Sequence, residues 1–130
     1  MTQREVAVAA STILIRCVDP RFEGEWAPTI QKAIGPHYSL TEFGGFDTLG
    51  EEGFQQLARK ISAIRKMNSA VHRIIVTFHT DCAWCGALRM NDEEQRTRAF
   101  ALARQIAYLF VPVEVFVGKV EEGWITLLNS

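Results

Sequence analysis

The sequence of 130 residues has no long hydrophobic run, no block of like charges and no low-complexity tract. Its apolar runs are far shorter than the roughly 20 residues that a membrane-spanning helix needs, so we expect no membrane span. The chain carries 14 Lys and Arg against 15 Asp and Glu, which gives a formal net charge of −1. Nucleic acids and anionic membrane surfaces are bound through clustered positive charge, and neither is therefore expected as a partner.

The sequence also has few cysteines and no signal for export. Its first residues, Met1–Glu5, lack the basic flank, long apolar core and cleavage site of a signal peptide. We therefore expect a cytoplasmic protein. In that reducing compartment, the three cysteines are expected to bind a metal or to take part in catalysis rather than to form disulfides.

What the sequence does contain is an alternation of strand-like and helix-like segments. Apolar or alternating stretches typical of strands lie at 6–17, 38–43, 71–78 and 113–120, with a possible short edge strand at 124–128. Helical patterns lie at 24–34, at about 50–67 and after residue 91. Pro28 is expected to break the first helix, and Asn91 with Glu94 forms a capping-box pattern for the last.

This alternation predicts an α/β fold. The length suits a single core, so we expect one domain over residues 1–130. The central sheet is expected to hold four mainly parallel strands in the order 2-1-3-4, with a possible fifth strand at the edge, covered by helices. Helices on one face only are the alternative. Ligands of such sheets bind beyond the carboxyl ends of strands, where the strand order reverses.

Two polar motifs follow the first and third predicted strands. The first strand ends in Cys17-Val18-Asp19-Pro20-Arg21, and the third is followed by His79-Thr80-Asp81-Cys82. If these two strands are neighbours, the motifs meet at one edge of the sheet. Cys and His are preferred ligands of zinc, and three protein ligands plus one exchangeable position define its hydrolytic sites. The sequence therefore predicts a zinc site.

Together these motifs resemble those of the β-class carbonic anhydrase family, in which a C-x-D-x-R strand end is followed later by H-x-x-C. The order, spacing and strand context match the family. Phe43-Gly44-Gly45-Phe46 falls where the family has its own glycine-containing turn, and the segment 113–128 resembles its last strands. The likeness therefore covers most of the chain.

The resemblance implies that zinc is held by Cys17, His79 and Cys82. It also implies a reaction, the reversible hydration of carbon dioxide to bicarbonate by a zinc-bound hydroxide. In that reaction Asp19 would orient the hydroxide. Arg21 would pair with Asp19 and hold its carboxylate off the metal.

Two departures from the family pattern concern this site. Glu42-Phe43-Gly44-Gly45 replaces the family's usual Arg-Asn-Ala-Gly turn, and Ala83-Trp84-Cys85-Gly86 stands where the family runs directly into Gly. The second departure adds a thiol. The fourth metal position would go to water, to Asp19 in a closed state known in part of the family, or to Cys85.

Other functions fit the same residues. The zinc-bound hydroxide could act on carbon disulfide or carbonyl sulfide, to which family relatives have turned. With Cys85 as fourth ligand, the protein could instead hold a closed, non-catalytic zinc site. Cys82-Ala83-Trp84-Cys85 also matches a thioredoxin-like redox motif. Against the redox function, the next helix is expected to begin near Asn91, and Cys17 and His79 would have no role.

The composition also predicts self-association. Eight Phe and three Trp in one small domain supply more apolar surface than the domain readily covers, and large exposed apolar patches usually mark interfaces. The family resemblance further implies active sites near subunit boundaries. We expect a homodimer or a higher even-numbered assembly.

Overall fold

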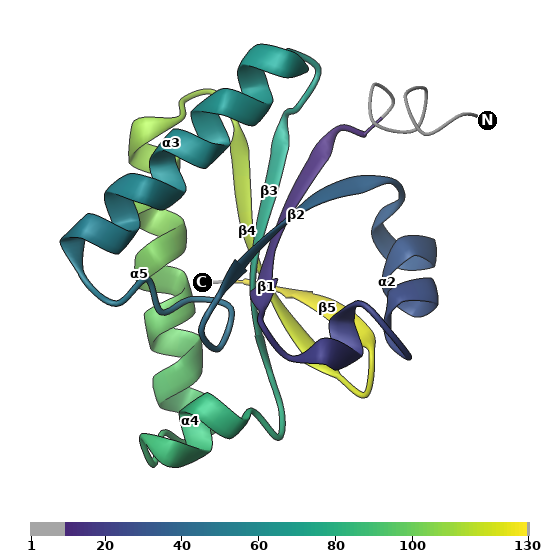
Figure 1. Cartoon of the computed structure of the whole chain (residues 1–130), viewed down its shortest axis with the longest axis vertical. Helices are drawn as coiled ribbons and strands as arrows, with labels where there is room; N and C mark the ends of the chain where they lie inside the picture. The colour runs from purple at the N-terminus through teal and green to yellow at the C-terminus, as the bar shows by residue number, and fades with distance from the viewer. Residues whose placement is uncertain (1–9, 130) are drawn as a thin grey trace.

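The structure is a computed structural model that describes residues 10–129. Its elements follow one another along the chain as strands and helices in alternation (Figure 1). They are β1 (Thr12–Cys17), the 3-10 turn η1 (Pro20–Phe22), α2 (Ala27–Ile34), β2 (His37–Glu42), α3 (Glu51–Met67), β3 (Arg73–His79), α4 (Ala83–Ala87), α5 (Asp92–Leu109), β4 (Glu114–Glu121) and β5 (Trp124–Leu128). No helix in this part of the chain is long and apolar enough to cross a membrane.

The five strands form one sheet in the order β2-β1-β3-β4-β5. The first three pairings are parallel, and β5 pairs antiparallel with β4 at the edge. All six residues of β1 are buried, as are the last six of β3, which suits strands covered on both faces. The predicted α/β fold and strand order are therefore confirmed, including the edge strand.

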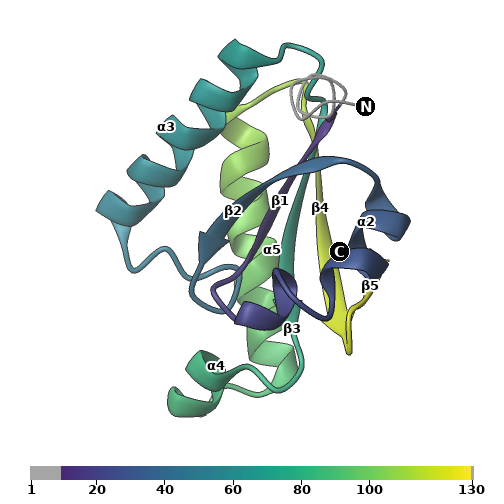
Figure 2. The same ribbon diagram turned by 45° about the vertical axis from the view of Figure 1, so that its right-hand side comes forward.

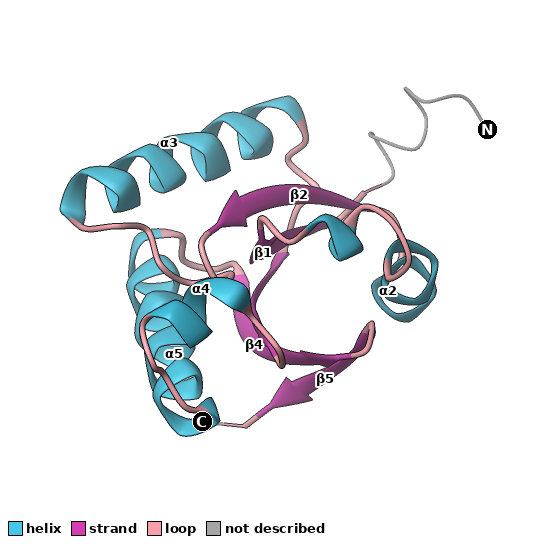
Figure 3. Cartoon of the chain, turned by 60° about the horizontal axis from the view of Figure 1, so that its bottom comes forward, coloured by secondary structure: helices cyan, strands magenta, loops and turns pink. Residues whose placement is uncertain are grey.

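Helices cover both faces of the sheet. α3 and α5 lie on one side, and α2 lies on the other, next to β5 (Figure 3). Each long helix buries one stripe: α3 buries Phe54, Leu57, Ile61 and Ile64, and α5 buries Gln95, Ala99, Leu102, Ala103 and Ile106. The alternative with helices on one face only is therefore wrong.

Three local expectations differ from the structure. The first predicted strand began at residue 6, but β1 begins at Thr12, and residues 6–9 lie outside the described residues. Pro28 does not break α2 but lies in its first turn, where a missing N–H costs no hydrogen bond. The expectation that no helix begins at the first cysteine of the C-x-x-C motif is also wrong, because α4 starts directly after Cys82.

The connections place both polar motifs at one end of the sheet. β1 lies between β2 and β3, and the chain leaves β1 through α2 on one face and β2 through α3 on the other. The strand order thus reverses at β1, and the carboxyl ends of β1 and β3 flank the reversal. Figure 2 shows η1 and α4, which follow these two strands, at the same end of the sheet.

Candidate metal centre

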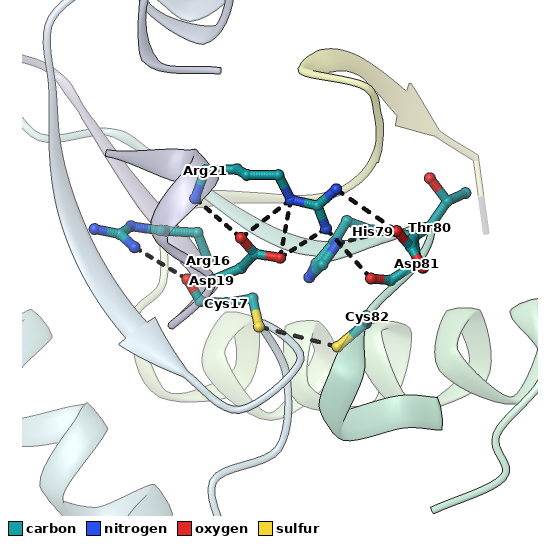
Figure 4. A network of polar contacts seen from close by, with 8 residues as sticks. All are labelled: Arg16, Cys17, Asp19, Arg21, His79, Thr80, Asp81 and Cys82. Carbon is teal, nitrogen blue, oxygen red and sulfur yellow. Dashed lines mark hydrogen bonds and ion pairs between the residues drawn. The ribbon is translucent and has the colours of Figure 1, made fainter. Parts of the chain in front are cut away.

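Three potential metal ligands converge at this end of the sheet. Cys17 is the last residue of β1, His79 is the last residue of β3, and Cys82 immediately precedes α4. Their ligand atoms all lie within 4.8 Å of one another, and all three residues are buried. The Sγ atoms of Cys17 and Cys82 are 4.0 Å apart (Figure 4). The structure thus brings together the three residues that the sequence predicted as ligands.

The His79 ring is oriented for metal binding. Its Nδ1 lies 2.8 Å from the Thr80 carbonyl oxygen, and because a carbonyl only accepts, Nδ1 carries the proton. Nε2 therefore presents a lone pair, and it is buried with no hydrogen-bond partner among the described residues. Phe22 and Trp26 pack edge-on against the ring, with centroids 5.4 and 5.6 Å away. A buried acceptor without a partner is costly, and a metal ion would satisfy it.

Beside the three ligands, Asp19 is bound by Arg21 through both carboxylate oxygens. Oδ2 accepts from Nη2 at 2.8 Å, Nε–H is 3.2 Å from each oxygen, and Oδ1 also accepts from the Arg21 backbone N–H at 2.9 Å. This hydrogen bonding holds the pKa of Asp19 below its usual value. The Arg21 guanidinium is itself held over the Trp26 ring, 4.3 Å from its centroid. Asp19 is thus ionised and directed to Arg21.

The thiols of Cys17, Cys82 and Cys85 shift one another's pKa values. Hydrogen bonds from Cys17 and then from Cys85 hold the pKa of Cys82 far below its usual value, and the hydrogen bond to Cys82 raises the pKa of both partners. Of the three thiols, Cys82 is thus the one whose deprotonation the others favour. A cation bound there would favour loss of a second thiol proton, because thiolate is the form that binds metals.

Cys85 is buried but is not part of the three-residue cluster. It lies instead under the turn after β2, where a Cβ atom added to Gly44 would come within 3.1 Å of the Cys85 Sγ. A Cβ atom on Gly45, whose φ is +94°, would collide with the carbonyl oxygen of Thr77 in β3. The glycine-containing turn therefore packs directly against the site.

Sequence reasoning missed two contributors to the site, Arg16 and Trp26. Arg16 is buried, and its Nη1 donates to the Cys17 carbonyl at 3.0 Å. Trp26 contacts both the His79 ring and the Arg21 guanidinium. The Cys-x-Asp-x-Arg spacing points to neither residue, and their roles arise only when η1 and α2 fold over the ends of β1 and β3.

The donor set fits zinc. Two thiols and one imidazole are ligands that zinc prefers, and the unpartnered His79 Nε2 is directed to the same cluster as the sulfur atoms. Three protein ligands leave at least one position of a tetrahedral site open. Neither Asp19 nor Cys85, the two residues considered as a fourth ligand, belongs to the cluster.

Comparisons with known proteins identify the fold. No protein-family model and no curated protein matches the sequence. A carbonic anhydrase from Streptococcus mutans is similar in structure, with a TM-score of 0.54 and 16% identity over 95% of this chain and 84% of that one. The β-carbonic anhydrase CafA of Aspergillus fumigatus has a TM-score of 0.54 and 13% identity over 92% and 76% of the two chains. Isoform I of the Trichomonas vaginalis β-carbonic anhydrase has a TM-score of 0.52 and 12% identity over 98% and 97%.

Proposed function

We propose that this chain, which has the fold of the β-carbonic anhydrases, is a zinc enzyme that hydrates carbon dioxide reversibly. The proposal is carried by one observation. The ligand atoms of Cys17, His79 and Cys82 lie within 4.8 Å of one another, and the buried His79 Nε2 has no hydrogen-bond partner among the described residues. Asp19 beside them is bound by Arg21 and does not join the cluster. Three protein ligands would leave the fourth position of a tetrahedral zinc site to a reacting water, whereas a closed structural site has four protein ligands.

The three ligands would hold Zn²⁺, which supplies a Lewis acid able to lower the pKa of a coordinated water to about 7. Asp19 acts as the orienting acceptor. Its carboxylate accepts from three Arg21 N–H groups, of which Nε–H is shared between the two oxygens, and it would also accept the proton of the reacting water. Arg21 keeps the carboxylate ionised and fixed in place. Asp19 then directs the oxygen lone pair of the water to the carbon of the substrate.

Aromatic packing on the site suits an apolar substrate. Phe22 and Trp26 cover the His79 ring, and Phe43 packs on Trp84 with centroids 4.8 Å apart. Carbon dioxide is small and apolar. Carbon disulfide and carbonyl sulfide share both properties, and they are therefore the comparison substrates.

The test is stopped-flow hydration of carbon dioxide on protein with a measured zinc content. We expect about one zinc per chain and a rate proportional to zinc. Cys17→Ser, His79→Ala and Cys82→Ser should each lose zinc and lower the stability, since metal binding couples to folding. Cys85→Ser tests the closed-site alternative: zinc should stay bound in this variant, and loss of zinc would make Cys85 a fourth ligand.

Two results would reject parts of this proposal. Full zinc occupancy in the three ligand variants would reject the metal site. A fully zinc-loaded wild type with no rate above buffer would reject carbon dioxide hydration, and turnover of carbonyl sulfide or carbon disulfide alone would reassign the substrate.

A further inference from the structure

A polar cavity lies on the side of the sheet covered by α2. Its volume is about 520 Å³, and its walls come from β1, β2, α2 and the chain after η1. Its polar lining residues are Arg16, Glu23, Gln31, His37 and Ser39. The apolar part of its wall is formed by Leu14, Phe22, Ala27, Pro28 and Ile30. A cavity of this size with a few convergent polar groups in an apolar wall has the form of a small-molecule site.

Arg16 is the chemically decisive residue of this cavity. Its side chain is only 7% exposed, which is unusual for a guanidinium because burying a charge is costly unless it is paired. Nη1 donates to the Cys17 carbonyl at 3.0 Å, and the group lies 5.8 Å from the centroid of the Phe22 ring. Its ionic partner is Glu23, whose Oε1 accepts from Nη2 at 2.7 Å.

The Arg16–Glu23 pair is asymmetric in its exposure. The Glu23 side chain is 73% exposed, so it loses little when it moves into water. One oxygen of Glu23 contacts one nitrogen of Arg16, whereas a planar guanidinium can bind a carboxylate through two parallel hydrogen bonds. Glu23 therefore occupies the position of a ligand carboxylate. It makes one hydrogen bond to Arg16, whereas a ligand carboxylate could make two.

We propose that this cavity binds a small organic carboxylate with an apolar body, whose carboxylate displaces Glu23 from Arg16. The body of the ligand would lie against Phe22, Ala27 and Pro28. Displaced Glu23 returns to water, to which it is already largely exposed. The ligand carboxylate replaces it as the partner of the buried guanidinium and can form two charge-assisted hydrogen bonds instead of one. This binding does not depend on the proposed reaction at the zinc site.

The test is a titration of zinc-loaded protein with benzoate, followed by amide chemical shifts in ¹H–¹⁵N NMR spectra. Saturable shifts are expected in residues 22–31 and 37–39. Glu23→Gln removes the internal competitor and should tighten benzoate binding several-fold, whereas Arg16→Gln should weaken it about tenfold or more. Lys32→Gln, which removes a positive charge from an exposed position on α2, is the matched control and should leave the affinity unchanged.

Two probes separate charge from apolar contact. Benzyl alcohol matches benzoate in size but has no charge, and formate has the charge but no apolar body; both should bind at least about tenfold more weakly than benzoate. Equal affinity for benzyl alcohol, unchanged affinity in Glu23→Gln, or shifts confined to residues 79–82 would each overturn the proposal. Because Glu23 is exposed, its variant gives a decisive result even if Arg16→Gln does not fold.

Discussion

Arg21 lies two residues after Asp19 and binds both of its carboxylate oxygens, with each side-chain contact at 3.2 Å or less. The two side chains are only 31% and 15% exposed, so water screens this pair less than it screens a surface ion pair. Pro20 between them begins η1, and the Asp19 carboxylate also accepts the Arg21 backbone N–H. The geometry of the pair is thus built into one short turn at the end of β1.

The first prediction is that Arg21→Ala keeps zinc but lowers carbon dioxide hydration roughly 10–100-fold, the usual effect of removing a group that orients an active-site residue. Without Arg21, the Asp19 carboxylate loses its two-oxygen partner and is free to turn toward the metal and displace the reacting water. The measurement is the hydration rate per bound zinc.

Two further variants make that comparison specific. Arg104→Ala removes an exposed arginine on α5 and should leave the rate unchanged. Asp19→Asn should keep zinc and also lower the rate, because an amide accepts the water proton less well than a carboxylate. Wild-type rates in both Arg21→Ala and Asp19→Asn would show that the pair is only structural.

The strand order could be predicted because the strand sequences constrain it strongly. Ile13–Ile15 and Ile74–Val76 are apolar on both faces, which indicates central strands, whereas alternation over 38–43 indicates an edge. α4 could not be predicted, because it has five residues and no side chain that caps its first turn. Its position depends on tertiary packing, with Cys85 buried under the turn after β2.

The candidate metal ligands could be predicted for a similar reason, since each motif follows a strongly apolar strand. Arg16 could not be predicted, because a charged residue in an apolar run gives no indication of its own burial. Its place depends on α2 covering that face of the sheet and on Glu23 seven residues later. Long-range packing of this kind leaves no local pattern in the sequence.

The second prediction concerns the close approach of the turn after β2 to β3. Gly45→Ala should lower the free energy of unfolding by about 2 kcal/mol or more, since a positive φ is strained for alanine and the new Cβ meets the Thr77 carbonyl. Gly86→Ala on α4 meets nothing within 4 Å and should be neutral or stabilising by up to about 1 kcal/mol. Urea unfolding measures both, and equal stabilities would contradict the packing described for this turn.

The third prediction is self-association into a dimer or a higher even-numbered assembly. Large apolar side chains are exposed at several places. Tyr108 and Val111, at and just after the end of α5, are 84% and 75% exposed, and Trp124 on the edge strand β5 is 71% exposed. Such surface usually marks an interface. Sedimentation velocity at micromolar concentration should show the assembly, and Trp124→Ser and Val111→Ser should identify which surface it uses. Monomer alone at that concentration would contradict the prediction.

The last prediction concerns Glu42, which pairs with Cys17 in the β1–β2 register. Burial is the main reason that the pKa of Glu42 lies above its usual value. Below the ordinary glutamate pKa of about 4.3, this side chain is protonated and neutral in the folded and the unfolded chain. Its burial then carries no cost of desolvating a charge. As the pH rises through the raised folded pKa, the folded chain bears the full cost of a charge in a half-buried place.

Glu42→Gln should therefore stabilise the zinc-loaded protein at pH 7, and the gain should shrink toward zero as the pH falls toward about 4.3. Loss of metal in acid affects the wild type and Glu42→Gln alike, so it cancels in the difference between their free energies of unfolding. Glu25→Gln, at an exposed position, is the matched control and should show no such dependence. The measurement is thermal or urea unfolding of the three proteins from pH 5 to pH 8. A gain that grows as the pH falls would reverse the sign and show that Glu42 is stabilised as the carboxylate by a favourable partner.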